Sequence, residues 1–270
     1  MFKFQLPSIY LKAILIFGLS VLFTVFVSSF RVVGKPYKYT LKTIVIDPGH
    51  GGSDPGCITT NSQEKVIALQ VSLKLGKFLR DSFPDMKVIF TRTVDKFVDL
   101  NERAVMANKA KADLFLCIHV NTSANSTAYG TESYAMGLYK AEGNLSVAKR
   151  ENDVVLLETD YKEKYEGYDP NSPESHIIFS MYQNAYLDKS LSLAYNIEEQ
   201  FKKSKRFSRG VKQAGFLVLW KCSMPSVLCE TGFISNPSER AYITNDSCQN
   251  IIARNLFIAI KKYKETAERN

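Results

Sequence analysis

The stretch TIVIDPGHGG, residues 43–52, combines a short β-branched run with a glycine-rich turn. The run TIVIDP at 43–48 predicts a buried strand, because β-branched side chains pack well on a pleated surface. The glycines that follow allow the backbone to approach a ligand closely. His50 is therefore expected to leave the carboxyl end of a strand on a ligand-binding loop.

Strands and helices alternate after this stretch. Apolar side chains recur at helical spacing over 64–83. Two further buried strands are predicted at KVIFTR (87–92) and DLFLCIHV (113–120), with a helix between them over 100–111. This alternation predicts an α/β domain with a central, largely parallel sheet.

The second half of the chain continues the pattern after an interruption. Residues 137–186 are polar and mixed, and such a long excursion in a compact domain is usually functional or mobile. Within it, two helical stretches are predicted at 148–157 and 174–183. Beyond it we expect a helix over 187–203, strands over 215–220 and 226–230, and a helix over 250–266.

The N-terminus has the composition of a targeting segment. Residues 1–30 contain Lys3 and Lys12 and no acid, and residues 13–30 carry no charge. This pattern predicts a signal peptide or an N-terminal membrane anchor, with a buried core helix as the alternative. Residues 31–42 are predicted to be a linker. The remaining domain is expected to be exported to the periplasm or cell envelope, anchored to the inner membrane if the segment is retained.

Composition excludes several classes. With 45% apolar and 23% charged residues, the 270-residue chain is not disordered over most of its length. Five cysteines without a CxxC pair exclude a disulfide-stapled miniprotein and a thiolate zinc finger, although Cys222 and Cys248 could pair outside the cytoplasm. The net charge of +8 fits a polyanionic partner. The export signal and the lack of a basic motif with interleaved aromatics argue against nucleic acid.

Three residues are candidate metal ligands. His50 and His119 each lie at the end of a predicted strand, and Glu64 begins the helix after the glycine-rich loop. Two histidines and one carboxylate are a common ligand set for catalytic zinc, with one position left for water. Taken singly, each could instead be structural: a turn residue, a strand-end histidine or a helix N-terminal charge.

Glu230 is a candidate general base. It ends a predicted buried strand beside Thr231-Gly232, where a carboxylate could take a proton from water activated by a metal. The alternatives are an N-cap role or an ion pair with Arg103 or Arg92.

Ordered motifs carry a family resemblance. They are IVIDPGHGGSDPG from residue 44, Glu64, TRTVDKFVDLNERAVMANKAKADLFLCIHVN from 91, RGVKQAGFLVL from 209 and MPSVLCETGFISNPSE from 224. In this order they closely resemble the zinc-dependent N-acetylmuramoyl-L-alanine amidases of bacterial cell walls, a type shared by division-associated, sporulation and phage enzymes. The resemblance covers 43–270, interrupted by 137–186. It implies one α/β domain with a twisted, mostly parallel sheet of about six strands flanked by helices on both faces.

The resemblance also implies residue roles. His50, Glu64 and His119 would bind one Zn²⁺, and Glu230 would be the catalytic carboxylate. The reaction would be hydrolysis of the amide between N-acetylmuramic acid and L-alanine in peptidoglycan, during wall remodelling or daughter-cell separation. From their positions, Asn121 after His119 and Arg209 before a predicted strand are candidate substrate-binding residues, with strand-end capping as the alternative for Asn121.

The interruption at 137–186 is a candidate regulatory insert. In some division-associated amidases a segment here covers the zinc until an activator protein removes it. By analogy Glu174 is the candidate autoinhibitory residue, with Glu151 and Glu158 as rivals and His176 also within the segment. The alternative is a surface decoration or a substrate-binding lid.

Two other functions compete with this interpretation. One is a zinc peptidase that acts on another amide, since metal and base would be the same. The other is a catalytically silent wall-binding protein, against which the intact set of His50, Glu64, His119 and Glu230 argues.

Overall fold

The computed structural model describes residues 39–138, 142–181 and 185–269, together with scattered positions among the first 21 residues. The chain divides into two units, residues 1–38 and residues 39–270. In the first unit, residues 16–21 are helical. None of the helices in the described part of the chain combines the length and apolar character needed to cross a membrane. Most of the predicted export segment (1–30) and linker (31–42) lies outside the described residues.

A six-stranded sheet organises the second unit. Its strand order is β4-β1-β5-β8-β6-β7, and every neighbouring pair is parallel except the antiparallel pair of β6 and β8. The predicted mostly parallel α/β fold is confirmed. The strands are β1 (Thr43–Pro48), β4 (Lys87–Phe90), β5 (Leu114–Asn121), β6 (Thr131–Met136), β7 (Ser208–Ala214) and β8 (Ser226–Phe233).

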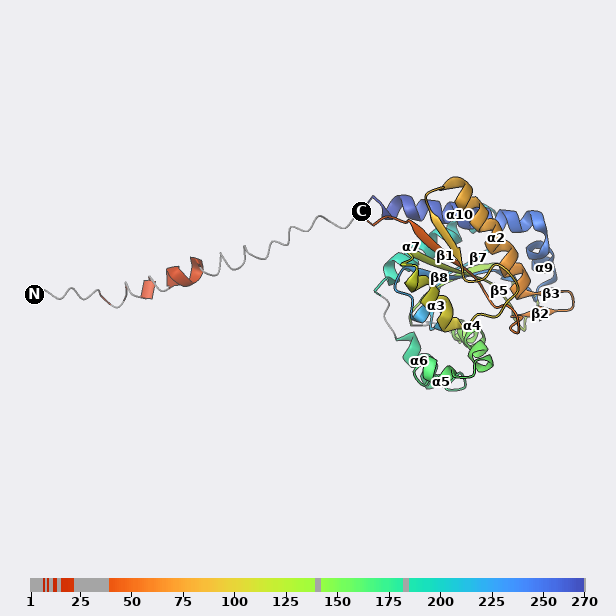
Figure 1. Cartoon of the computed structure of the whole chain (residues 1–270), viewed down its shortest axis with the longest axis horizontal. Coiled ribbons are helices and arrows are strands. Elements are labelled where there is room, and N and C mark those ends of the chain that lie inside the picture. The colour runs from red at the N-terminus through yellow and green to blue at the C-terminus, as the bar shows by residue number, and fades with distance from the viewer. Residues whose placement is uncertain are drawn as a thin grey trace, which may run out of the picture. The chain divides into compact units, whose positions relative to one another are not determined.

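Helices cover both faces of this sheet. Every residue of β5 and β8 is buried, as expected for central strands covered on two sides. One hydrophobic core contains side chains of α2 (Glu64–Ser82), α7 (Leu187–Lys203) and α10 (Asp246–Ala267). Figure 1 shows α10 and α2 on the opposite side of the sheet from α3. A second core contains side chains of α3 (Leu100–Lys109) and α8 (Leu217–Trp220).

The insert packs into the second core. Its elements are α4 (Glu142–Asn152), the 3₁₀ helix η1 (Asp153–Leu157), α5 (Tyr161–Lys164) and α6 (Pro173–Ser180). Three of its aromatic side chains are at most 5% exposed: Tyr165, Tyr168 and Phe179. Asn152 ties the insert to the backbone before α8, since it donates to the carbonyl of Gly215 and accepts from the amide of Leu217. The insert is therefore part of the domain's packing, as the lower part of Figure 1 shows.

Two details of the sequence prediction are wrong. Residues 215–220, predicted as a strand, contain the short helix α8, and the strand precedes them as β7. β7 lies at the sheet edge and most of its residues are only half-buried, so its sequence SRGVKQA lacks the apolar run of a central strand. β6 was not predicted, because its sequence TESYAM is polar despite complete burial.

The remaining elements were also not predicted. They are the hairpin of β2 (Ile58–Thr59) and β3 (Ser62–Gln63), and α9 (Pro237–Thr244). α9 begins with an Asn236 cap and a proline, a typical helix start.

Candidate metal centre

Strand pairing brings the two candidate histidines together. β1 and β5 are parallel neighbours with Pro48 opposite Ile118, so His50 and His119 emerge at the same edge of the sheet. Their rings are 4.7 Å apart between centroids. His50 has φ 59°, a left-handed conformation that is uncommon for a residue other than glycine.

The glycine-rich loop leaves no room for extra side chains around the histidines. A Cβ at Gly49 would lie 2.5 Å from the His119 ring. A Cβ at Gly56 would lie 2.6 Å from the His50 ring and 2.8 Å from a Glu64 carboxylate oxygen. The close approach of backbone to these three side chains therefore requires glycine at both positions.

The predicted ligand trio meets at one point. Glu64 Oε1, from the first residue of α2, lies 3.2 Å from His50 Nε2 and 3.0 Å from His119 Nδ1. All three side chains are at most 8% exposed. The structure thus gathers residues that are 14 and 69 positions from His50 in the sequence into one buried cluster.

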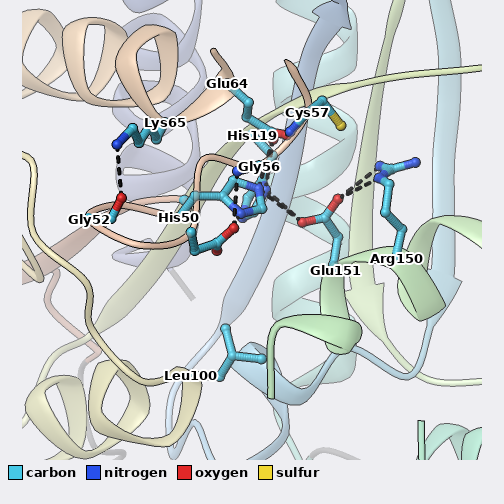
Figure 2. Close-up of polar contacts among 12 residues, drawn as sticks. His50, Gly52, Gly56, Cys57, Glu64, Lys65, Leu100, His119, Arg150 and Glu151 are labelled. Carbon is cyan, nitrogen blue, oxygen red and sulfur yellow. Dashed lines mark hydrogen bonds and ion pairs between the residues drawn. The ribbon is translucent and has the colours of Figure 1, made fainter. Parts of the chain in front are cut away.

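A fourth residue, Glu151, completes the cluster. It reaches in from α4, and its Oε2 lies 3.3 Å from His50 Nε2 and 3.0 Å from His119 Nδ1. The donor atoms of all four residues lie within 4.8 Å of one another. Figure 2 shows Glu151 pointing at the two histidines from the side of the insert.

The predicted role of Glu174 is not supported by its position. Glu174 is exposed and accepts a hydrogen bond from the Ser172 hydroxyl at 2.7 Å. The rival Glu158 is bonded to the Tyr165 hydroxyl, and His176 contacts Tyr168 and the carbonyl of Pro170. Of the insert residues named from the sequence, Glu151 alone joins the group of side chains that could hold a metal ion.

Three buried polar atoms at this cluster lack hydrogen-bond partners among the described residues: His50 Nε2, Glu151 Oε2 and Glu230 Oε2. Burial of polar atoms without partners is unfavourable unless something else satisfies them. Two imidazole nitrogens and two carboxylates are a suitable donor set for zinc. The residues therefore fit a divalent metal ion of this type.

The charge of the cluster also favours a cation. Burial alone would lower the pKa of His50, but the Glu64 carboxylate and the hydrogen bond to Asp54 raise that pKa well above its usual value. Burial raises the pKa of Glu230, and the nearby carboxylates of Glu151 and Glu64 raise it further. When the two imidazoles carry no extra proton, the three buried carboxylates outnumber the one guanidinium that contacts them, that of Arg150. A metal ion can then supply the positive charge that protonated histidines would otherwise provide.

Outer contacts fix the orientation of both rings. His50 Nδ1 lies 2.7 Å from Asp54 Oδ2, and His119 Nε2 lies 3.1 Å from Cys117 Sγ. Cys117 in turn donates to Asp47 Oδ2 at 2.8 Å. When the outer nitrogen of each ring is hydrogen-bonded in this way, the inner nitrogen is left to face the cluster. The positions of Asp54 and Cys117 in these contacts were not predicted.

Two arginines hold the backbone that carries His50. Arg103 Nη1 donates to Asp47 and to the carbonyl of Pro48, and Nη2 donates to the carbonyl of His50. Arg92 donates to the carbonyls of Pro48 and Gly49. The side chains of both arginines are committed to this loop, so the predicted alternative of an ion pair between Glu230 and either of them is wrong.

Glu230 lies beside the cluster and contacts the insert. It is opposite His119 in the pairing of β5 with β8 and is fully buried. Its Oε1 is 3.5 Å from Arg150 Nη2, and the same nitrogen is 2.8 Å from Glu151 Oε1. α4 thus contacts the histidine cluster through Glu151, which Figure 2 shows beside Arg150. It contacts Glu230 through Arg150.

A small cavity borders the cluster. The cavity lined by His50, His119 and Glu151 has a volume of about 10 Å³, which is the space of one water molecule at most. Asn121 and Arg209, the candidate substrate-binding residues, line a separate hollow of about 470 Å³. Both contact Glu132 there, Asn121 at 2.5 Å and Arg209 at 2.9 Å.

An α/β domain with histidines and carboxylates at the carboxyl ends of its parallel strands, and a buried glutamate beside them, has the arrangement of a metal-dependent hydrolase.

Comparisons with known proteins narrow this class. The family model for N-acetylmuramoyl-L-alanine amidase matches residues 44–262. The chain is 33% identical over 226 residues to the amidase AmiA of Salmonella typhimurium, covering 82% of this chain and 76% of that protein. It is 32% identical to the sporulation-specific amidase of Bacillus subtilis over 211 residues, 78% of this chain and 64% of that protein. The chain belongs to the N-acetylmuramoyl-L-alanine amidase family.

Solved structures agree with this assignment. An N-acetylmuramoyl-L-alanine amidase from Clostridium difficile 630 superposes with a TM-score of 0.63 and 28% identity, covering 84% of this chain and 99% of that one. The CwlD amidase of Clostridioides difficile, solved in complex with the GerS lipoprotein, gives a TM-score of 0.60 and 25% identity, covering 83% and 99%.

Proposed function

We propose that this protein hydrolyses the amide between N-acetylmuramic acid and L-alanine in peptidoglycan, with one zinc ion held by His50, Glu64 and His119. The observation that carries the proposal is the convergence of these three side chains within 3.2 Å contacts beside the buried carboxylate of Glu230. Membership of the amidase family supports the same reaction.

Each residue has a distinct task in this proposal. When bound, zinc polarises the scissile carbonyl and lowers the pKa of water at the site. Glu230 accepts the proton of the attacking water and delivers it to the leaving nitrogen, since its Oε2 has no hydrogen-bond partner among the described residues. Asp54 and Cys117 keep the imidazoles of His50 and His119 oriented toward the metal.

The insert closes the site in this proposal. Glu151 takes a position among the ligands that substrate or water would otherwise use, and Arg150 pairs with Glu230. The cavity of about 10 Å³ at the cluster is far too small for a muramoyl peptide. α4 must therefore move before the substrate amide can reach the metal, and we propose that an activator protein moves it. The relative CwlD was solved with the GerS lipoprotein, which supports a partner of this kind.

The reaction is tested with purified peptidoglycan and mass analysis of the soluble products. We expect free stem peptides that begin with L-alanine, and we expect their loss with a zinc chelator and in Glu230→Gln. Glu174→Gln is the matched control, because Glu174 is an exposed glutamate outside the cluster. Products cut within the stem peptide would support a zinc peptidase instead. Zinc-loaded, folded protein that binds peptidoglycan without cutting it, even after Glu151→Ala, would support a silent wall-binding protein.

The closing role of Glu151 is tested by Glu151→Ala in the full chain. We expect turnover to rise by about tenfold or more, since a closed state favoured by about 1.4 kcal/mol already suppresses the open one tenfold. Glu174→Ala should leave turnover unchanged. Equal or lower activity of folded, zinc-loaded Glu151→Ala would show that Glu151 is a ligand or structural residue and not a latch.

We also propose that residues 1–30 export the domain to the periplasm or cell envelope, where peptidoglycan lies. The uncharged stretch at 13–30 supports export. Fractionation of cells and sequencing of the mature N-terminus test this: a new N-terminus near residue 31 indicates cleavage, and an intact Met1 in the membrane fraction indicates an anchor. Protein found only in the cytoplasm would contradict export.

A further inference from the structure

The hollow beside Glu230 is lined by the sheet edge, the loop after β5 and helix α4 of the insert. Asn121 ends β5, Glu132 lies on β6, and Arg209 and Lys212 lie on β7. Glu132 is the direct partner of Glu230 in the pairing of β6 with β8, so the hollow opens next to the proposed catalytic carboxylate. With about 470 Å³ it can hold a small peptide segment even while α4 is in place.

Glu132 organises the base of this hollow. It is 1% exposed and accepts hydrogen bonds from four side chains: Asn121, Tyr134, Arg209 and Lys212. Burial would raise its pKa, but Lys212 and the hydrogen bonds around it hold the pKa below its usual value. The carboxylate is thus an ionised anchor that fixes two cationic side chains in place.

These two cations exceed the available negative charge. Arg209 and Lys212 both bind Glu132 Oε2, and Glu132 is the only acid among the described residues that line the hollow. The remaining cation of the lining, Arg150, is already paired with Glu151 and Glu230. The hollow therefore has one positive charge that no lining carboxylate neutralises.

Arg209 has donors available for a ligand. Among the described residues it donates a hydrogen bond through Nε alone, and its guanidinium lies over the Phe233 ring at 5.0 Å. The side chain is 36% exposed, so the two terminal nitrogens can reach an incoming group. A guanidinium fixed in this way is suited to bidentate recognition of a carboxylate.

We propose that this hollow is the subsite for the residue after L-alanine in the stem peptide, and that Arg209 binds the free α-carboxylate of that residue while Lys212 supplies the adjacent charge. The inference rests on the proposed function, since it takes the scissile amide to lie at Glu230. The residue concerned is a γ-linked glutamate, which occurs with a free α-carboxylate or as the uncharged amide.

The distances between strands agree with this placement of the stem peptide. β7 lies two strand spacings from β8, about 10 Å at about 4.8 Å per spacing. An extended peptide advances about 3.4 Å per residue, so the second stem residue begins about 3.4 Å beyond the scissile bond. Its carboxylate and the long Arg209 side chain extend toward each other across the remaining distance. The positive charge of the hollow would therefore favour stem peptides whose second residue has a free α-carboxylate over stem peptides in which that group is the uncharged amide.

The test uses the zinc-loaded full chain carrying Glu151→Ala and Glu230→Gln, so that the site is open and the bound ligand is not hydrolysed. Calorimetry compares N-acetylmuramoyl-L-alanyl-D-glutamate, whose α-carboxylate is free, with the α-amide form of the same compound. We expect the acid to bind about tenfold or more tightly than the amide, the effect of a charge-assisted hydrogen bond. Addition of Arg209→Gln should remove this preference while affinity for the amide stays unchanged.

Two controls keep the result specific. Arg254→Gln removes an exposed arginine on α10, outside the hollow, and should leave both affinities unchanged. Thermal melting checks that Arg209→Gln stays folded, with Lys212 still available to neutralise Glu132.

Three outcomes overturn the inference: equal affinity for acid and amide, no binding of either, or an equal loss of both affinities in Arg209→Gln. The proposed reaction is judged separately, from cleavage of whole peptidoglycan by the Glu151→Ala chain with native Glu230. Cleavage without acid preference refutes the subsite alone. Acid preference without cleavage refutes the proposed reaction while the carboxylate site stands.

Discussion

The buried pair of Asp47 and Arg103 gives the sharpest stability prediction. Asp47 is fully buried, Arg103 is 2% exposed, and their charged atoms are 2.9 Å apart. Arg103→Met would leave the Asp47 carboxylate with only Thr91 and Cys117 as hydrogen-bond donors, and would also strip donors from the carbonyls of Val98, Pro48 and His50. Loss of one partner of a buried ion pair typically costs about 3–5 kcal/mol, and we expect the free energy of unfolding to fall by that amount.

Urea unfolding of the metal-free protein at pH 7 measures this loss. The double variant Asp47→Asn with Arg103→Met should lose less than the sum of the single variants, with a coupling energy of about 1–3 kcal/mol, because no charge is then left buried alone. Arg254→Met is the control, since Arg254 is exposed. A loss below about 1 kcal/mol for Arg103→Met, or strictly additive losses, would refute the reasoning.

Three further predictions concern the ligand cluster and the core. Gly49→Ala should weaken zinc binding in a competitive chelator titration, because its Cβ would lie 2.5 Å from the His119 ring. Gly143→Ala is the control, since no atom lies within 4 Å of its Cβ, and it should leave zinc affinity unchanged. Equal zinc affinities of the two variants would contradict the expected clash. Cys117→Ala should lower zinc affinity by about 10–100-fold. Cys117→Ser keeps a donor and an acceptor toward Asp47 and His119, so it should retain most of the native zinc affinity. Equal affinity of the native protein and both variants would show that the Cys117 thiol does not orient the His119 ring. Burial raises the pKa of Glu198 despite hydrogen bonds from three hydroxyls, so the carboxyl holds its proton more tightly in the folded protein than in the unfolded chain. The stability that this proton contributes is therefore fully present below pH 4.5 and is lost as the pH rises through the raised pKa of the folded state. Glu198→Gln should therefore flatten the pH dependence of the urea midpoint above 4.5, and an unchanged slope would contradict the assignment.

The sequence predicts the parts of the fold that repeat simple patterns. The apolar runs of β1 and β5 and the periodic helices α2 and α7 were found within a few residues of their bounds. Strands β6 and β7 were not predicted, because their sequences are polar and form strands only by pairing: β6 with β8, and β7 with β6. The complete burial of β6 is a property of the assembled sheet and not of local composition.

The same distinction holds for the site. His50 and His119 could be paired from sequence because the ends of parallel strands share one edge. The choice among Glu151, Glu158 and Glu174 could not be made, since it depends on where the insert packs. α4 buries Val147 and Ala148 against the domain, and that packing presents Glu151 to the histidines while Glu174 faces solvent.

The burial of Tyr165, Tyr168 and Phe179 in the main body of the domain has a consequence for control. If α4 left the site together with α5 and α6, these rings would be exposed to water. The fraction of molecules with an open site would then depend on the free energy of burying these rings as much as on the contacts of Glu151. A binding partner that turns the open form from about one molecule in a hundred to nearly all must prefer it by about 5.5 kcal/mol. Substitutions in this aromatic group, which lies away from the candidate metal ligands, would then change the activity measured without a partner. Warming toward the melting temperature would raise that activity before the domain unfolds.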